Sequence, residues 1–282
     1  MKINTQLQRK WRDNLQHLVA DAEKTLFISS PFVTQSGVDF LKANLRKKFK
    51  NDGELAFLTN LSPTNILQGS NSPDAFISLK SEMANLKLWH LPKLHAKVYI
   101  SDKNKSIVTS GNLTNGGLFS NFEYGIQIND FVESAKIYDD IYGYCQLGSE
   151  LDVGTLQSLS EIAKGIAKKR EKVQSEISKE INELLFSAQD ELVKDRLQKG
   201  ATHSVFAKTI LYVLNKFPNG LSTENIHAEV QEIHPDLCDD TIDRIIDGKS
   251  FGKKWKHAVR TAQQHLKKNG QIILRDGVWN AK

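Results

Sequence analysis

Short apolar runs alternate with amphipathic helical patterns over residues 1–150, and this alternation constrains the fold more than any other feature. Five runs have the length and apolar character of strands: Thr25–Ser29, Glu54–Thr59, Leu86–Trp89, His95–Ile100 and Ser106–Ser110. Helical patterns at Gly37–Lys48 and Asp74–Ala84 lie between them, and a strand at Phe122–Ile128 and a helix at Val132–Gly148 follow. The alternation predicts an α/β domain with a central mixed sheet over residues 1–150.

A second segment, residues 151–200, has a different composition. Between Leu156 and Leu197 there is no proline, glycine is almost absent, and apolar residues recur at steps of three and four. This spacing predicts one long amphipathic helix, or two that are broken near Gly165. We interpret it as a helical connector, which acts as a spacer, a dimer contact or both.

A third segment, residues 201–282, has the pattern of a winged helix. A helix is expected at Val205–Phe217, a second one capped by Ser222 or Thr223, and a third at Trp255–Lys268. An acidic stretch, Asp236–Asp247, intervenes before the third helix. The turn Arg275-Asp276-Gly277 then joins two short strands, Gln271–Leu274 and Val278–Asn280.

Charge is distributed unevenly in this third segment. The whole chain has 38 Lys/Arg and 33 Asp/Glu, a net charge of +5. Residues 249–282 alone hold nine basic residues and one acidic residue, whereas residues 201–248 hold three and eight. A dense basic segment favours a nucleic acid partner, and a solvated charged helix is the alternative.

The sequence has no feature of a membrane or secreted protein. No run of about 18 apolar residues occurs, and the first thirty residues lack the apolar core of a signal peptide. The two cysteines, Cys145 and Cys238, match no metal or redox spacing. We therefore expect a soluble cytoplasmic protein without cofactor, metal or membrane partner.

The segment Leu94–Glu123 carries polar side chains at strand-like spacing. His95 and Lys97 project together on a strand, because alternate side chains share a face. Ser110 and Asn112 share a face on the next strand and its exit, and Glu123 lies on the strand after that. Together these groups can bind a phosphodiester, attack it and stabilise a charged transition state. Each residue alone also fits a surface or turn position, but the joint spacing favours an active site. The core face of the last strand is assigned to Phe122, Tyr124 and Ile126.

This pattern resembles the phospholipase D superfamily, whose motif is His-x-Lys-x4-Asp followed by Gly-Ser-x-Asn. His95, Lys97 and Asp102 stand at that spacing, and Ser110 and Asn112 follow, with Thr109 in place of the glycine. Asp102 is either a member of the set or the start of a turn before Lys103-Asn104-Lys105. The run VTSGNLT and the following NFE are most similar to the metal-independent restriction endonucleases of that superfamily, in which a glutamate lies shortly after the asparagine.

The resemblance implies a homodimer. Enzymes of the superfamily use two histidines, and this chain carries one copy of the motif. His95 of one subunit would attack phosphorus and form a phosphohistidine, and His95 of the other would protonate the departing oxygen. Lys97, Asn112 and Ser110 would hold the phosphate oxygens, and Glu123 would orient an imidazole.

The helix expected at Trp255–Lys268 resembles the recognition helix of winged-helix domains. Basic and amide side chains fall roughly on one face, and Val259, Ala262 and Leu266 supply the buried face. Arg260 and Gln264 can make bidentate base contacts, whereas the lysines suit phosphates. The candidate DNA-binding residues are Lys253, Lys254, Lys256, His257, Arg260, Gln264 and, at the wing tip, Arg275. A winged helix used for protein contact is the alternative.

These features predict a restriction-type DNA endonuclease that acts on double-stranded DNA. Two other functions stay open. One is a phospholipase or phosphatidyl transferase, which shares the phosphoryl chemistry. The other is a DNA-binding regulator whose nuclease fold is not catalytic. The recognised DNA sequence, and any requirement for a modified base, do not follow from the sequence.

Overall fold

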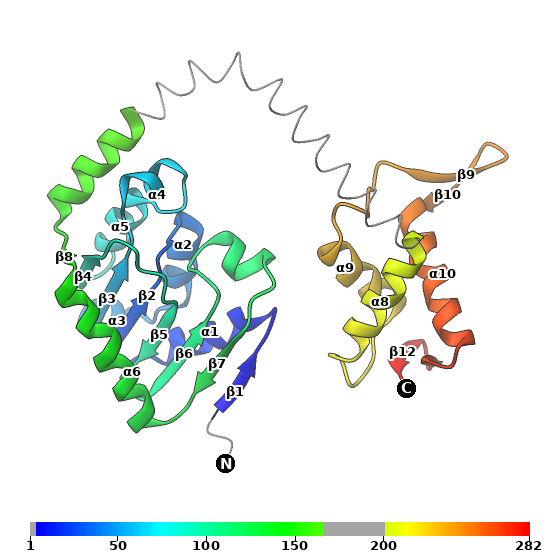
Figure 1. The fold of residues 1–282 in the computed structure, drawn as a ribbon, viewed down its shortest axis with the longest axis horizontal. Helices are drawn as coiled ribbons and strands as arrows, with labels where there is room; N and C mark the ends of the chain where they lie inside the picture. Colours follow the sequence, from blue (N-terminus) through cyan, green and yellow to red (C-terminus); the bar gives the residue numbers. More distant parts are fainter. Residues whose placement is uncertain (1–3, 166–200) are drawn as a thin grey trace. The chain divides into compact units, whose positions relative to one another are not determined.

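The protein is described by a computed structural model of residues 4–165 and 201–282 (Figure 1). The chain divides into two compact units, Met1–Gln174 and Ser175–Lys282. Most of the expected connector helix lies outside the described residues, and so does the expected dimer contact in that helix.

An eight-stranded mixed sheet forms the centre of the first unit (Figure 1). Its order is β1-β7-β6-β5-β2-β3-β4-β8. The strands are β1 Asn4–Leu7, β2 Thr25–Ser29, β3 Glu54–Thr59, β4 Asn85–His90, β5 Val98–Ser101, β6 Lys105–Thr109, β7 Gly125–Ile128 and β8 Ser149–Glu150. β2, β3 and β4 run parallel, whereas the other neighbouring pairs are antiparallel. The predicted α/β fold with a central mixed sheet is confirmed.

Helices cover both faces of this sheet. They are α1 Trp11–Asp21, α2 Gln35–Asn44, α3 Lys47–Asp52, α4 Pro63–Leu67, α5 Pro73–Lys80, the π-helix η1 Gly116–Ser120, α6 Phe131–Gly143 and the 3₁₀ helix η2 Tyr144–Leu147. Leu26 and Ile28 of β2 belong to a core shared with α1, α2 and α5. Phe27 belongs to a second core, under α6. β2 is an uninterrupted apolar run because both of its faces are buried.

Several boundaries differ from the prediction. The helix expected at Gly37–Lys48 is divided into α2 and α3, because Leu45 takes an extended conformation with ψ 129°. The helix expected at Val132–Gly148 is α-helical only to Gly143 and continues as η2. β5 starts at Val98, so His95 and Lys97 precede the strand instead of lying on it.

The assignment of Phe122 and Tyr124 to the core is wrong. β7 starts at Gly125, and these two side chains are 55% and 57% exposed. A Cβ at Gly125 would lie 2.5 Å from the Val108 carbonyl oxygen, so only glycine allows β6 and β7 to approach there. The chain enters the sheet only at this contact, so the aromatic rings of the residues that precede Gly125 are exposed.

The first unit extends beyond residue 150. Residues 153–165 are helical, and Leu156 is buried in the larger core. The hydroxyl of Ser160 donates to Asp74 at the start of α5, at 2.6 Å, and Lys164 forms an ion pair with the same carboxylate at 2.9 Å. This part of the expected connector is therefore held on the sheet domain.

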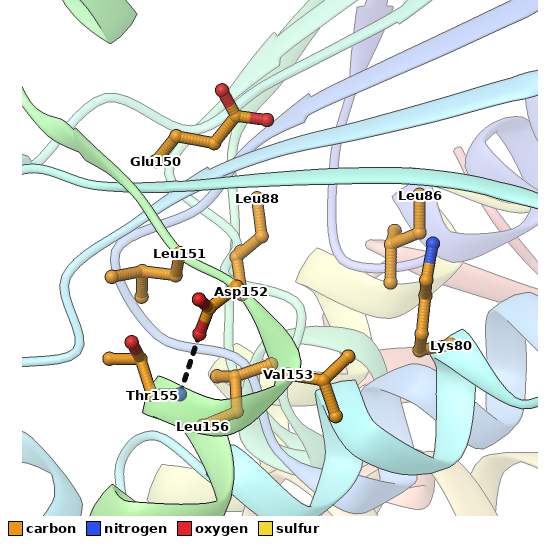
Figure 2. A pocket seen from close by; sticks show the side chains of 9 residues that line it. All are labelled: Lys80, Leu86, Leu88, Glu150, Leu151, Asp152, Val153, Thr155 and Leu156. Atoms are coloured by element: carbon orange, nitrogen blue, oxygen red, sulfur yellow. Dashed lines mark hydrogen bonds between the residues drawn. The ribbon is translucent and has the colours of Figure 1, made fainter.

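A cavity of about 490 Å³ lies between this helix, α5 and β4 (Figure 2). Its lining is largely leucine and valine, and Asp152 caps the helix by accepting the Thr155 N–H at 2.7 Å. None of its lining residues belongs to the candidate catalytic set.

Residues 201–282 of the second unit form three helices and two hairpins (Figure 1). They are α8 Thr202–Leu214, α9 Thr223–Ile233, α10 Lys254–Lys268, the pair β9 Asp243–Ile246 and β10 Lys249–Lys253, and the pair β11 Ile272–Arg275 and β12 Val278–Ala281. Phe206 of α8, Ile226 of α9 and Val259 of α10 meet Trp279 of β12 in one core. Leu221 forms a bridge with Trp279 and so adds to the last hairpin.

The acidic stretch before α10 contains a strand that the sequence analysis did not predict. β9 lies within Asp236–Asp247 and pairs with β10. Asp247 and Gly248 have φ of 49° and 76°, the left-handed conformation of a tight hairpin turn. The Asp-Gly pair is the signal that could have revealed this hairpin.

Two local predictions in the second unit agree with the structure. Ser222 is the N-cap of α9 and accepts the Asn225 N–H at 3.2 Å. Asp276 and Gly277 form the turn between β11 and β12. Across residues 4–165 and 201–282, no helix is long and apolar enough to cross a membrane.

Candidate active site and nucleic-acid interface

The antiparallel strands β5, β6 and β7 bring the candidate residues to one edge of the sheet. Val98 at the start of β5 lies opposite Val108, near the end of β6, and Thr109 lies opposite Gly125 at the start of β7. His95 and Lys97 enter β5, Ser110 and Asn112 leave β6, and Glu123 enters β7. The residues therefore converge as the spacing predicted, although all five lie just outside the strands.

Lys97 is held against His95. Its Nζ lies 3.0 Å from Nδ1 and 3.3 Å from Nε2 of the ring, and it donates to the His95 carbonyl oxygen at 2.9 Å. Lys97 is 7% exposed, whereas His95 is exposed. Burial lowers the pKa of Lys97, and the negative charge of Glu123 opposes this shift. A buried ammonium beside an exposed imidazole is suited to an anion that approaches from solvent.

Glu123 lies beside Ser110. The Ser110 hydroxyl donates a short hydrogen bond to Glu123, and its Oγ accepts the Tyr124 N–H at 3.0 Å. The amide of Asn121 donates to the other carboxylate oxygen at 3.1 Å. The carboxylate thus orients a hydroxyl here; the hydrogen bonds of the described residues do not link it to an imidazole.

Asn112 lies in a loop that two glycines allow to pack closely. A Cβ at Gly111 would lie 2.4 Å from the Trp11 ring, and a Cβ at Gly117 would lie 2.3 Å from the Asn112 carbonyl oxygen. The indole of Trp11 donates to the Gly117 carbonyl at 2.8 Å. The side-chain oxygen of Asn112 is buried and has no hydrogen-bond partner among the described residues. This oxygen is an acceptor, so any contact of Asn112 with a phosphate oxygen would have to come from its amide NH2 group.

Thr109 occupies the place of a glycine in the related motif, and the loop accommodates it. Its hydroxyl donates to the Tyr124 carbonyl at 3.2 Å and accepts the Gly111 N–H at 3.2 Å. The threonine therefore joins β7 to the loop.

Asp102 does not lie with the other candidates. It follows β5, at the sheet edge opposite to His95, and its φ of 49° belongs to a turn. Its carboxylate accepts the N–H groups of Glu23, Lys24 and Thr25 at 2.8–2.9 Å. Burial raises the pKa of Asp102, but these hydrogen bonds outweigh burial and leave it below its ordinary value. Asp102 was expected either to belong to the catalytic set or to start a turn, and its position supports the turn.

Sequence reasoning missed Trp11, which fixes the site from α1. Its ring is 1% exposed and lies 5.4 Å from that of Tyr99, whose hydroxyl donates to the Gly111 carbonyl at 3.0 Å. The sequence feature that could have indicated a role for Trp11 is its position within a basic run, QRKWR, although this run is far from the motif in sequence.

A further histidine, His90, ends β4 at the same edge of the sheet. Its Nδ1 accepts the Leu61 N–H at 3.0 Å, and burial lowers its pKa. Strands β2 and β3 separate β4 from β5, so His90 is about 14 Å from His95 along the sheet. Within the described ranges, no three His, Cys, Asp or Glu side chains are grouped to hold a metal ion.

In the second unit, α10 presents a polar face to solvent. Val259, Ala262 and Leu266 are buried as predicted, at 0%, 0% and 2% exposure. The solvent-facing candidates are Lys254, Arg260 and Gln264 on α10 and Arg275 at the end of β11. Lys256 is partly buried and lies over the Trp255 ring.

Two of the predicted DNA-binding residues have partners in the β9–β10 hairpin: Lys253 joins its two strands, and His257 joins it to α10. Lys253 pairs with Asp243 at 2.8 Å. His257 contacts the Phe251 carbonyl at 2.7 Å through Nε2 and Arg244 at 3.0 Å through Nδ1. These side chains have internal partners, whereas the side chains of Lys254 and Arg260 form no hydrogen bond or ion pair with another residue of 4–165 or 201–282.

Residues 15–143 match a family described as "Cardiolipin synthase, PLD-like domain". The matched residues lie within the first unit. A comparison with curated protein sequences found no match.

Solved structures similar to this chain include two bacterial Nuc proteins. NucT from Helicobacter pylori is 15% identical with a TM-score of 0.37, over 51% of this chain and 92% of its own. Nuc from Salmonella typhimurium, a phospholipase D family member, is 16% identical with a TM-score of 0.39, over 52% and 97%. The phosphatidylserine synthase of Haemophilus influenzae is 15% identical with a TM-score of 0.44, over 61% and 46%.

The position of Asp102 leads to a stability prediction. Asp102→Asn removes the charge but keeps a residue that tolerates positive φ. We expect a loss of about 1–3 kcal/mol in the free energy of unfolding at neutral pH, because three backbone donors lose a charged acceptor. The stabilisation exists above the ordinary pKa of 3.8 and disappears as pH falls through the lower folded pKa.

Urea unfolding of both proteins at neutral pH and at about pH 3 measures this difference, which should be smaller in acid. Asp140→Asn, at an exposed position of α6, is the control and should leave stability unchanged. A variant as stable as the wild type at neutral pH would contradict the structural role.

Proposed function

We propose that this protein is a restriction-type DNA endonuclease that hydrolyses phosphodiester bonds without a metal ion. The observation that carries the proposal is the convergence of His95, Lys97, Ser110 and Asn112 at one sheet edge, with the imidazole exposed and the ammonium buried behind it. This set supplies a nucleophile, a positive charge and hydrogen-bond donors, which phosphoryl transfer requires.

In the first step a ring nitrogen of His95 attacks phosphorus. A nitrogen–phosphorus bond forms, and the bond from phosphorus to the departing DNA oxygen breaks. That oxygen takes a proton from a second, protonated histidine. In the second step this histidine removes a proton from water, the water oxygen attacks phosphorus, and the bond to His95 breaks.

The second histidine comes from another copy of the chain, which makes the protein a homodimer. His90 cannot supply this proton to the same phosphate, because two strands separate it from His95. Apolar side chains beside the site are open to a second copy: Val108 and Tyr124 are 36% and 57% exposed next to Ser110.

The other polar residues have roles that follow from their contacts. Lys97 and the Asn112 amide bind the non-bridging oxygens, where negative charge increases in the transition state. The Ser110 hydroxyl donates to Glu123 and accepts the Tyr124 N–H, so it can donate to a phosphate oxygen only after it turns away from the carboxylate. Because Lys97 can neutralise the phosphate, we propose that no metal ion takes part.

For the second unit we propose a winged helix that reads DNA through α10. This proposal is supported by the exposed Lys254, Arg260 and Gln264 on one side of α10, and by the buried Val259 and Ala262 on the other. The β11–β12 hairpin, with Arg275, would be the wing. Residues from the start of α10 enter a major groove in such domains.

Lipid chemistry is the second candidate, because the matching family carries the name of cardiolipin synthase. A transferase of that kind would use the same histidine, but with an alcohol in place of water. A DNA-binding regulator with an inactive PLD-like domain is the third reading. The cleavage experiment that follows distinguishes them.

The first prediction of this proposal concerns cleavage. We expect the purified protein to nick or cut plasmid DNA in excess EDTA, and the His95→Ala variant to be inactive at the same concentration. Plasmid from methylating and non-methylating hosts is compared side by side on a gel. Activity that EDTA abolishes and magnesium restores would contradict metal independence. Headgroup exchange on phospholipid, without DNA cleavage, would favour the lipid reading.

The shared site predicts how mixed dimers behave. Co-expressed wild-type and His95→Ala chains with different tags give heterodimers that two purification steps isolate. We expect these heterodimers to be nearly inactive, because each shared site lacks one histidine. Lys48→Gln in place of His95→Ala is the matched control. Half or more of the wild-type rate in the His95→Ala heterodimer would refute the two-histidine mechanism.

The solvent-facing side of α10 predicts two kinds of binding defect. Lys254→Gln should weaken binding to all duplexes alike and lower its salt dependence, because the lysine suits a phosphate. Arg260→Ala should reduce discrimination at particular base pairs by about 1–3 kcal/mol. Binding selection on a random duplex library, with Lys208→Gln on α8 as control, measures both. Unchanged binding and discrimination in both variants would contradict the assignment to α10.

A further inference from the structure

A basic segment between β1 and α1 lies at the catalytic edge, and the proposed mechanism gives it no role. β1 runs antiparallel to β7 and places Leu7 opposite Gly125. The chain that follows Leu7 therefore continues at the edge where Glu123 enters β7. It contains Arg9, Lys10 and Arg12 around the buried Trp11.

Trp11 fixes this segment to the catalytic loop. Its indole donates to the Gly117 carbonyl at 2.8 Å, and its ring leaves no room for a Cβ at Gly111. Asn112 lies between these two glycines in sequence. Any displacement of residues 9–12 would displace the loop that carries Asn112, so the two arginines hold a fixed position relative to the site.

Each arginine lies over an aromatic ring. The Arg9 guanidinium is 5.4 Å from the ring centre of Phe122, and that of Arg12 is 5.1 Å from the ring centre of Phe119. The rings are 55% and 43% exposed. A guanidinium on a ring face keeps its N–H groups at the edge of its plane, where a phosphate can accept them. The Nη2 atom of Arg9 is buried, so a phosphate would bind the other N–H groups of this residue.

Phe119 and Phe122 flank the residues that position Glu123. Phe122 directly precedes it, and Asn121, between the two phenylalanines, donates to its carboxylate. The arginines thus lie beside the part of the site that Ser110 and Glu123 form. Arg12 also contacts Asp13 at 3.3 Å, but both side chains are more than a third exposed. Ion pairs of that kind contribute little, so a phosphate can replace the carboxylate.

We propose that Arg9 and Arg12 form a second phosphate-binding site, which binds the DNA backbone next to the scissile phosphate. This inference rests on the proposed nuclease function and adds a binding role for the N-terminal segment. The phenylalanines serve as platforms that orient the two guanidinium groups. Lys97 and Asn112 bind the reacting phosphate, and the arginines bind a neighbouring one.

The test compares the full chain with its Arg9→Gln/Arg12→Gln variant, both in the His95→Ala background so that DNA stays intact. Binding of a labelled duplex is measured by fluorescence anisotropy over a range of salt concentrations. We expect weaker binding and a salt slope smaller by about 0.9, since the variant loses one phosphate contact. Lys47→Gln/Lys48→Gln, which removes two exposed charges from α3 at the opposite edge, should leave the slope unchanged.

Two further comparisons separate a binding role from a structural one. The Arg9→Lys/Arg12→Lys variant keeps the charges and should retain most of the slope, with intermediate affinity. In the catalytically intact protein, Arg9→Gln/Arg12→Gln should lower cleavage of long DNA more than cleavage of bis-p-nitrophenyl phosphate, which has no neighbouring phosphate.

Three results would overturn the proposal: an unchanged salt slope, an equal loss in the α3 variant, or an equal loss on both substrates. Arginine-dependent binding to mixed phosphatidylglycerol and phosphatidylcholine vesicles, without a change on DNA, would assign the arginines to lipid and also overturn it. Because duplex binding is measured without cleavage, the arginine site can succeed or fail separately from the nuclease. An intact protein that cleaves no substrate would refute only the nuclease proposal.

Discussion

The candidate site depends on the packing of Trp11 between two glycines. The indole fills the space beside Gly111 and donates to the carbonyl of Gly117. This contact joins the first helix to a loop that lies about one hundred residues later in the sequence. Without it, nothing in the described hydrogen bonds would fix the exit of β6 against α1. The Asn112 backbone, the arginines on their rings and the Tyr99 hydroxyl are all positioned from this contact.

The layered fold could be predicted because its signals are local. A strand buried on both faces has consecutive apolar residues, and the middle residues of β2 and β3 have that property. The ends of elements were harder to predict. Whether Leu45 continues a helix or becomes extended, and whether Phe122 joins a strand, depends on tertiary contacts such as that of Gly125 with Val108. The β9–β10 hairpin was not predicted because the segment around it is rich in charged residues, and its Asp-Gly turn was not recognised as a hairpin signal.

The residues of the candidate site were predictable from their spacing, but their contacts were not. Sequence spacing identified a histidine, a lysine, a serine and an asparagine that the sheet brings to one edge. It did not indicate that Glu123 would bond to Ser110, or that Asp102 would bind the N–H groups of residues 23–25 at the far edge. Trp11 and its flanking arginines form a basic run in the sequence, but their relation to the site exists only in three dimensions.

The outer strands of the sheet influence how two copies can associate. β1 has four residues and β8 has two, so neither offers a long row of unpaired backbone groups. On β4, beside the short β8, Lys87 is paired with Glu54 at 2.7 Å. Short and charged outer strands disfavour growth of a sheet from one molecule into the next. Among the described residues, association of two copies through strand addition at these edges is therefore disfavoured, which favours a closed pair over an open-ended chain of molecules.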